Sequence, residues 1–404
     1  MKLLLYAHAF APMIGGIETY TMLLATGLAE AVPTETATPR VTVVTQARSN
    51  GMDDSVLPFR VIRRPGVIRL VRMIGDADVI HIASPAFLPM LFAWLLRKPV
   101  VVEHDTYQSV CPNGLLFHEP TKSDCPGHFR ARRFKECLSC NLENLGAWGS
   151  LRVLVLTFPR RWLCRRMTLH IGPSAHVAGR VGMPRTQVIY HGVRPPAVQF
   201  CPDSASSDVC FAFIGRMVNE KGVPILLRAA QQLANLGYDF RLKLIGDGPV
   251  RAELERMVDE LDLRERTIFT GFLEGEALRE AMKDVTAAVM PSICQDVAPL
   301  ASIELMLDGR LVIASDIGGL GELVDDVGLK FSPGDFTALA DCLRQVLEHP
   351  GLARQLGNRA SERARALFTY DRMARDHLQA YVQIVPAKAV HGMSEAKHIP
   401  RRYS

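Results

Sequence analysis

Short apolar runs and longer stretches of helical period alternate along most of the chain, which is typical of helices that cover parallel sheets. In the first half, the expected strands are 3–8, 41–46, 79–83, 100–104, 170–173 and 187–191. A second set is expected at 210–215, 241–246, 267–271, 287–291 and 311–315. The pattern therefore predicts an α/β protein with two Rossmann-like domains.

The segments outside this alternation mark the domain boundaries. A polar, Pro- and Ser-rich stretch separates the two sets of strands, and residues 106–146 have no clear periodicity, so they read as an irregular insertion. The last residues are polar and basic without a pattern, which is typical of a disordered tail. We expect an N-terminal domain over 1–195 with its insertion at 106–146, a linker over 196–208, a C-terminal domain over 209–367, a terminal helix over 368–385 and a tail over 386–404.

Length and composition agree with two folded domains. The 404 residues exceed one ordinary core, and 48% hydrophobic with 22% charged residues excludes disordered and fibrous classes. The apolar start is interrupted by His8 and Pro12, too soon for a signal peptide, and the apolar run over 86–96 is too short to cross a bilayer. Nine cysteines, an odd number, favour a reducing compartment, so we expect a cytoplasmic protein.

The charge is unevenly distributed. Residues 1–195 hold 23 basic and 13 acidic side chains, a net charge of +10, whereas the remainder carries −5. Residues 151–195 contain eight Arg and no acid, interleaved with apolar side chains, which indicates an anionic partner. Nucleic acid and an anionic membrane surface both fit this charge, although few aromatic residues are available there to stack on bases, which weakens the case for nucleic acid. The alternative is a buried helix with a basic exposed end.

Glycines and cations follow several expected strands at the edge where open α/β sheets bind ligands. Gly15-Gly16 opens a helix, where free N–H groups favour phosphate, although a tight turn alone would also explain the pair. In the second half, Arg216 and Lys221 share a loop that offers two cations to a diphosphate, although solvated surface cations remain the alternative. Gly246 and Gly271-Phe272 end the next strands, where backbone and an apolar ring would contact a base.

Two carboxylates, Asp296 and Glu304, lie on a loop and on the expected helix after it. This path can bring both into one cleft. Together with Gly15-Gly16-Ile17-Glu18 and the Gly215-Arg216 to Lys221-Gly222 loop, the pair resembles the motifs of the retaining family 4 glycosyltransferases. The resemblance covers roughly residues 1–385 and implies the GT-B fold, two Rossmann-like domains facing a central cleft.

The resemblance also implies roles for individual residues. Arg216 and Lys221 would clamp the donor diphosphate, and His104 would face the donor sugar. Asp296 would contact the sugar ring at a position where the family usually has Glu, and Glu304 would hold the ribose hydroxyls. The catalytic candidates are His104, Asp296, Arg216 and Lys221. The donor-binding candidates are Gly15, Gly16, Gly215, Gly246, Gly271, Phe272, Pro299, Leu300 and Glu304.

No catalytic metal or cofactor is expected. Asp76-Ala77-Asp78 matches the Asp-x-Asp pattern of metal-dependent transferases but lies before a strand, at the edge opposite the expected site. In the insertion, Cys111, Cys125, Cys137 and Cys140 could form a structural zinc site, although irregular spacing favours unpaired or redox-active thiols.

The resemblance implies transfer of a sugar from a UDP- or GDP-linked donor to a glycan or lipid-linked acceptor with retention of configuration, in surface polysaccharide or glycolipid assembly. Such an enzyme would lie in the cytoplasm, peripherally on the inner face of the membrane. The alternatives are a nucleotide-sugar epimerase or hydrolase on the same fold, and a binder without catalytic activity. A dehydrogenase is disfavoured because no Gly-x-Gly-x-x-Gly follows the first strand.

Overall fold

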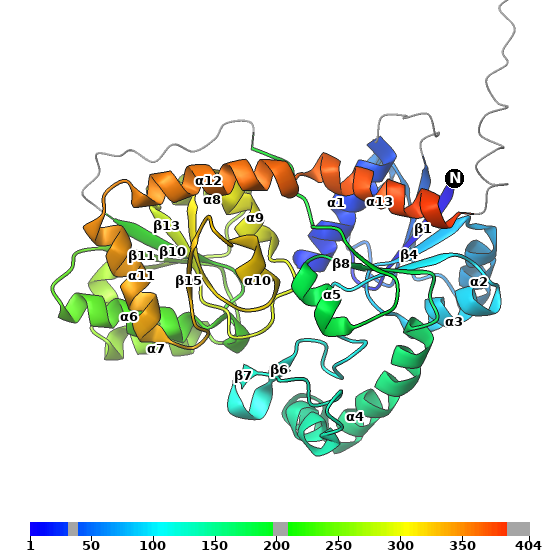
Figure 1. Ribbon diagram of the computed structural model, residues 1–404, viewed down its shortest axis with the longest axis horizontal. Coiled ribbons are helices and arrows are strands. Elements are labelled where there is room, and N and C mark those ends of the chain that lie inside the picture. The colour runs from blue at the N-terminus through cyan, green and yellow to red at the C-terminus, as the bar shows by residue number, and fades with distance from the viewer. Residues whose placement is uncertain (31–38, 197–208, 386–404) are drawn as a thin grey trace, which may run out of the picture. The chain divides into compact units, whose positions relative to one another are not determined.

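The computed structural model describes residues 1–30, 39–196 and 209–385, and the predicted tail and nearly all of the predicted linker lie outside these ranges. Contacts divide the chain into two compact units, each built around one parallel sheet (Figure 1). The first unit comprises 1–114, 147–192 and 370 onward, and the second comprises 115–146 and 193–369. The two Rossmann-like α/β units predicted from the strand pattern are confirmed.

The first sheet has seven parallel strands in the order β3-β2-β1-β4-β5-β8-β9. Its central strands are buried on both faces, which explains why they read as continuous apolar runs. The elements of this unit are β1 (Lys2–Ala7), α1 (Gly16–Glu30), β2 (Arg40–Thr45), β3 (Arg60–Arg63), α2 (Val67–Asp76), β4 (Val79–Ile82), α3 (Phe87–Leu95), β5 (Val100–Glu103), β8 (Leu169–Gly172), α5 (Ala175–Val181), β9 (Thr186–Val188) and α13 (Tyr370–Ile384).

The second sheet has six parallel strands in the order β12-β11-β10-β13-β14-β15. Its core packs Phe211 and Leu242 of the sheet with Leu226 and Leu343 of two covering helices. The elements are β10 (Cys210–Ile214), α6 (Val223–Asn235), β11 (Arg241–Ile245), α7 (Arg251–Glu260), β12 (Thr267–Gly271), α8 (Gly275–Met282), β13 (Ala287–Met290), α9 (Leu300–Leu307), β14 (Leu311–Ser315), α10 (Gly318–Leu323), β15 (Leu329–Phe331), α11 (Phe336–Glu348) and α12 (Leu352–Leu367).

The strand order reverses at β1 in the first sheet and at β10 in the second, since each of these strands lies between its two later neighbours. Ligands bind open α/β sheets outside the carboxyl ends of the strands at such a switch point. The loops that carry Gly15-Gly16 and Gly215-Arg216 leave these two strands. The topology therefore puts both predicted phosphate loops where each sheet alone would bind a ligand.

The predicted insertion is more regular than expected. It contains a short hairpin of β6 (Phe117–His118) and β7 (Ser123–Asp124), and α4 (Phe134–Cys164) begins inside it. The helix is broken at Gly146, whose φ of 66° is not helical. Cys137 and Asn141 form part of its buried face, and these residue types do not stand out in an apolar pattern.

Helix α13 packs along α1 within the first unit (Figure 1). The approach is close, because a Cβ atom built on Gly27 of α1 would lie 2.9 Å from the Cβ of Ala374 and 3.2 Å from the ring of Tyr370. The Tyr370 hydroxyl donates to Glu30 at 2.8 Å. Gly27 is thus required by packing rather than by backbone conformation.

We expect Gly27→Ala to destabilise the first unit by about 1–3 kcal/mol, because the added methyl group must displace α13. The matched control is Gly179→Ala in α5, where a Cβ atom meets nothing within 4 Å. That change should stabilise the first unit by roughly 0.4–1 kcal/mol, because alanine lowers the conformational entropy of the unfolded chain. Urea unfolding followed by circular dichroism measures both, and an unchanged midpoint for Gly27→Ala would contradict the packing argument.

Candidate functional site

In the second unit, the loops after β10, β11 and β12 are in direct backbone contact. The Gly246 amide donates to the Gly271 carbonyl at 2.8 Å, and the Met217 amide donates to the Asp247 carbonyl at 2.8 Å. A Cβ atom on Gly246 would lie 2.0 Å from the carbonyl oxygen of Gly215, and its φ of +132° also disfavours any other residue. The structure therefore brings Gly215, Gly246 and Gly271 together at one edge of the sheet.

Lys221 and Asp296 form an ion pair at the same edge. The Lys221 Nζ lies 2.7 Å from Asp296 Oδ1, with 19% and 14% of the two side chains exposed. Ser292 Oγ donates to the other carboxylate oxygen at 2.6 Å. Burial lowers the pKa of Lys221, but the charge of Asp296 outweighs it and raises that pKa above its ordinary range. Two predicted catalytic residues thus lie together as a charged pair, whereas Arg216 on the same loop is exposed.

Glu304, on α9, faces a cavity of about 530 Å³ that Ile214, the last residue of β10, also lines. Burial raises the pKa of Glu304. The described residues that line this cavity include neither Lys221 nor Asp296.

The remaining donor-binding candidates of the second unit lie around the ends of β12 and α9. Phe272 is exposed beyond β12. Pro299 precedes the first turn of α9, and Leu300, the first residue of that helix, is buried.

In the first unit, the Gly15-Gly16 turn begins α1. The Thr19 amide donates to the Gly15 carbonyl at 3.0 Å, so Gly15 belongs to the first turn. A Cβ atom on Gly15 would lie 2.4 Å from Glu18 Oε2, whereas one on Gly16 would meet nothing within 4 Å. The backbone of Gly16 is therefore open to a ligand, and the Glu18 carboxylate covers that of Gly15.

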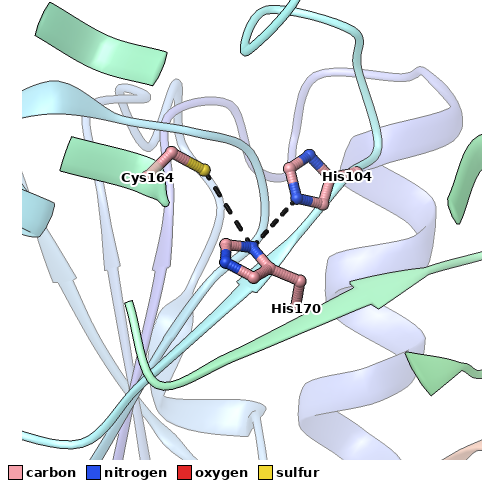
Figure 2. A group of neighbouring side chains, drawn as sticks. All are labelled: His104, Cys164 and His170. Carbon is pink, nitrogen blue, oxygen red and sulfur yellow. Dashed lines mark hydrogen bonds between the residues drawn. The ribbon is translucent and has the colours of Figure 1, made fainter. Parts of the chain in front are cut away.

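His104 follows β5 and is fully buried. Its Nε2 atom lies 3.1 Å from Nδ1 of His170, and Cys164 Sγ lies 4.0 Å from that same Nδ1 atom (Figure 2). Its Nδ1 atom is 3.4 Å from Ser109 Oγ. Both ring nitrogens thus have protein partners, so contact with a donor sugar requires one of them to be released.

Burial sets the protonation of this group. It lowers the pKa of His104 to about 3 and that of His170 to about 4. It also raises the pKa of the Cys164 thiol to about 12. All three side chains are therefore neutral at neutral pH, and the hydrogen bond between the two imidazoles needs no charge.

The residue before His104 is the centre of a buried polar network that the sequence analysis missed. The Glu103 carboxylate accepts a hydrogen bond from the Tyr20 hydroxyl and lies 3.1–3.4 Å from Nε2 atoms of His81, His191 and His377. Burial would raise the pKa of Glu103, but the charge of His377 and the histidine hydrogen bonds lower it well below its usual range. The partners come from four distant segments, so no local motif marked them.

Asp105 joins this network through His191, whose Nε2 atom lies 3.1 Å from Asp105 Oδ1. Burial lowers the pKa of His191, but hydrogen bonds to Asp105 and Glu103 outweigh it and raise that pKa to about 9. His81, in β4, forms a hydrogen bond of 2.9 Å between its Nδ1 atom and the Tyr381 hydroxyl. The first unit thus holds two buried acids beside three buried histidines.

The sequence candidates for metal binding occupy different places. Asp76 lies 3.0 Å from Lys2 Nζ, and Asp78 accepts from the Lys2 amide at 2.7 Å, so this pair anchors the start of β1. Cys111 belongs to the first unit and Cys125, Cys137 and Cys140 to the second, and all four are buried. The zinc site on these cysteines stays a prediction.

Comparison with known proteins matches part of this chain to glycosyltransferases. Residues 202–363 match the family described as glycosyl transferases group 1. The 2-deoxystreptamine glucosyltransferase of Streptomyces kanamyceticus is 37% identical over 140 residues, 34% of this chain and 36% of that protein. The D-rhamnosyltransferase WbpZ of Pseudomonas aeruginosa is 32% identical over 163 residues, 39% and 41% of the two chains. The chain thus spans less than half the length of these relatives.

Solved structures share the fold over nearly the whole chain. Anabaena Alr3699/HepE in complex with UDP superposes with a TM-score of 0.71 at 19% identity, covering 95% of this chain and 100% of that one. Sucrose-phosphate synthase from Thermosynechococcus elongatus gives 0.69 at 22% identity, with 95% and 98% covered. These likenesses establish the GT-B fold.

We expect the free energy of unfolding to fall as the pH drops from about 6.5 towards about 4. The unfolded chain then binds protons on the imidazoles of His104 and His170, whereas the folded state keeps both neutral. His170→Asn should reduce the slope of the free energy of unfolding against pH by about 1.4 kcal/mol per pH unit. Urea unfolding across this range measures it, with His176→Asn on α5 as control. A wild-type slope in His170→Asn would contradict the conclusion that burial keeps His170 neutral in the folded state.

Proposed function

We propose that this chain, which belongs to the glycosyl transferases group 1 family of retaining family 4 glycosyltransferases, transfers a sugar from a nucleotide-sugar donor to a glycan or lipid-linked acceptor with retention of configuration. The observation that carries the proposal is the Lys221–Asp296 pair beside the close-packed glycine loops of the second unit. At this edge of the sheet, a fixed positive charge lies beside glycine backbone that a diphosphate can approach.

The reaction needs charge stabilisation on the departing diphosphate. Lys221 is held charged by Asp296, and Arg216 on the same loop is exposed to solvent, so both can turn to a bound diphosphate. A charge-assisted contact contributes roughly 1.5–3 kcal/mol, most effectively where the charge develops. Asp296 would then exchange part of its contact with Lys221 for a sugar hydroxyl.

Other residues are proposed to bind the ribose, the base and the phosphates of the donor. Glu304 is proposed to accept hydrogen bonds from the ribose hydroxyls at the cavity that it lines. Phe272, exposed beyond Gly271, would cover the base. UDP, present in the Anabaena complex, and GDP are the two nucleotides considered. On the first unit, Gly16 would offer its open backbone to the donor phosphates, with Gly15 beside it.

Lys221→Ala should reduce nucleotide release from the preferred UDP- or GDP-sugar at least tenfold, because the leaving diphosphate loses one neutralising charge. The matched control is Lys243→Ala, which also breaks a lysine–aspartate pair in this unit, with Asp284 before β13, at the opposite edge of the sheet. The assay is nucleotide release across a donor panel with EDTA present. Near-normal turnover in Lys221→Ala would refute the assignment.

The same assay separates the alternatives. A transferase releases nucleotide faster when acceptor is added, whereas an epimerase or hydrolase turns over donor without one. A binder without activity would retain UDP or GDP in direct binding measurements and release nothing with any acceptor.

We further propose that the first unit contacts an anionic membrane at the inner face, in the cytoplasm, where the lipid-linked acceptor would lie. Within the described residues, no helix combines the length and apolar character needed to cross a bilayer. The support is a surface of α3 and α4 that exposes Trp94, Trp148, Phe158 and Trp162, with Trp148 83% exposed. Aromatic side chains beside basic ones are typical of helices that lie in a membrane interface.

Basic residues border this aromatic surface. The Trp94 and Trp162 rings meet edge to face at 5.7 Å, and the Arg166 guanidinium lies 3.6 Å from the Trp162 ring centroid. Arg97 and Lys98 line a neighbouring cavity of about 460 Å³ with Trp94 and Arg166. The negative potential of a cytoplasmic leaflet attracts such cations.

The double variant Arg165→Glu, Arg166→Glu should weaken binding to vesicles of anionic lipid on the order of tenfold or more, because each basic residue near the surface contributes about 1 kcal/mol. The control, Arg354→Glu with Arg359→Glu, makes the same change in net charge on the exposed face of α12. Vesicle flotation measures both. Equal loss in the two variants, or binding indifferent to anionic lipid, would argue against this surface.

A further inference from the structure

Three potential metal ligands converge in the region over 115–146. His118 ends β6, His128 lies in the loop after β7, and Glu136 is in the first turn of α4. One ligand atom from each lies within 4.8 Å of the others. Nε2 of His118 is 3.5 Å from Oε2 of Glu136, and the two imidazole centroids are 5.0 Å apart.

The two imidazoles present nitrogens that the protein leaves unsatisfied. Nε2 of His118 and Nδ1 of His128 are buried and have no hydrogen-bond partner in the described part of the chain. His118 as a whole is only 7% exposed. Burying an unpaired polar atom costs free energy, so a ligand that pairs with both nitrogens would stabilise this cluster.

The other nitrogen of His118 is held by a neighbour. Its Nδ1 atom lies 2.8 Å from the hydroxyl of Thr121, which is 2.7 Å from that of Ser123. The hairpin pairing of His118 with Ser123 fixes this arrangement. Histidines that bind metals usually have the second nitrogen engaged in this way, which fixes the ring and leaves the first nitrogen as the ligand.

Four groups of three ligands occur among the described residues, and the other three consist of buried residues alone. His104 and His170 bind each other, with Cys164 beside them as a neutral thiol. The two groups that contain Glu103 use its carboxylate for hydrogen bonds inside the first unit. Of the four, the His118 group is the one with an exposed member, Glu136, from which an ion can enter.

We propose that His118, His128 and Glu136 bind one divalent cation of the zinc class, with water completing the coordination. Zinc binds imidazole nitrogen and carboxylate oxygen at about 2.0–2.2 Å, so neighbouring ligands on a tetrahedral ion lie about 3.4 Å apart. The observed 3.5 Å between His118 and Glu136 fits this geometry. Glu136 has 48% of its side chain exposed, which gives the ion a path from solvent.

The ion would tie together the hairpin, the following loop and the start of α4. These segments have little regular structure between them, so a shared ion replaces the core that so short a region cannot build. The site differs from the cysteine site expected from the sequence and does not depend on the proposed transfer reaction.

The test uses full-length protein freed of metal with a chelator and titrated with Zn²⁺, and with Co²⁺ as a spectroscopic probe. We expect one equivalent to bind, and the Co²⁺ complex to show weak visible bands without intense thiolate charge-transfer absorption. His128→Asn and Glu136→Gln should each weaken Zn²⁺ binding at least tenfold. Glu143→Gln, at an exposed position of the same helix, is the matched control and should bind as the wild type does.

His128 is only partly buried, so His128→Asn keeps the test valid if a variant at buried His118 fails to fold. Circular dichroism confirms that each variant is folded. No binding by the wild type, unchanged binding by both folded variants, or intense thiolate absorption with Co²⁺ would each overturn the proposal. The last result would assign the metal to cysteines instead.

Discussion

A buried carboxylate is the constraint around which the first unit is arranged. Glu103 ends a strand with both faces covered, where an unpaired negative charge would cost several kcal/mol. Tyr20 from α1 and His377 from α13 form hydrogen bonds with it, and Nε2 of His81 from β4 lies 3.1 Å from it. Helix α13, which is distant in sequence from β5, is therefore held by polar contacts with the sheet and by the close packing against Gly27 of α1. Loss of any one partner would remove one of the polar contacts that stabilise this buried carboxylate.

The second unit uses charge differently. Its ion pair lies at the edge of the sheet, on loops that the chain holds together through glycine backbone rather than through side chains. The ion pair with Asp296 holds the Lys221 ammonium in place, so in the proposed donor complex this ammonium would lose less conformational freedom on binding a diphosphate. The ion pair would also compete with the donor, whose binding would have to release more free energy than breaking the pair costs.

The sequence predicted strands wherever both faces are buried, as in Val100–Val102, because continuous apolar runs are conspicuous. It missed β3, whose Arg60 and Arg63 mark a short edge strand, and the first turns of α4, whose buried face includes Cys137 and Asn141. The loop residues of the second unit were found from local spacing, and the structure brings Lys221 to Asp296. Their roles stay predictions. The Glu103 network was out of reach because its partners at 20, 81, 191 and 377 meet only after folding.

The distribution of tryptophan gives the protein a built-in optical probe. The chain has three, Trp94, Trp148 and Trp162, all on α3 and α4 of the first unit, and each is at least 40% exposed. Intrinsic fluorescence therefore reports almost entirely on the surface that these helices present. Transfer of these indoles from water to a less polar medium would shift their emission to shorter wavelength without any label. Events confined to the second unit, which contains no indole, would leave that emission unchanged.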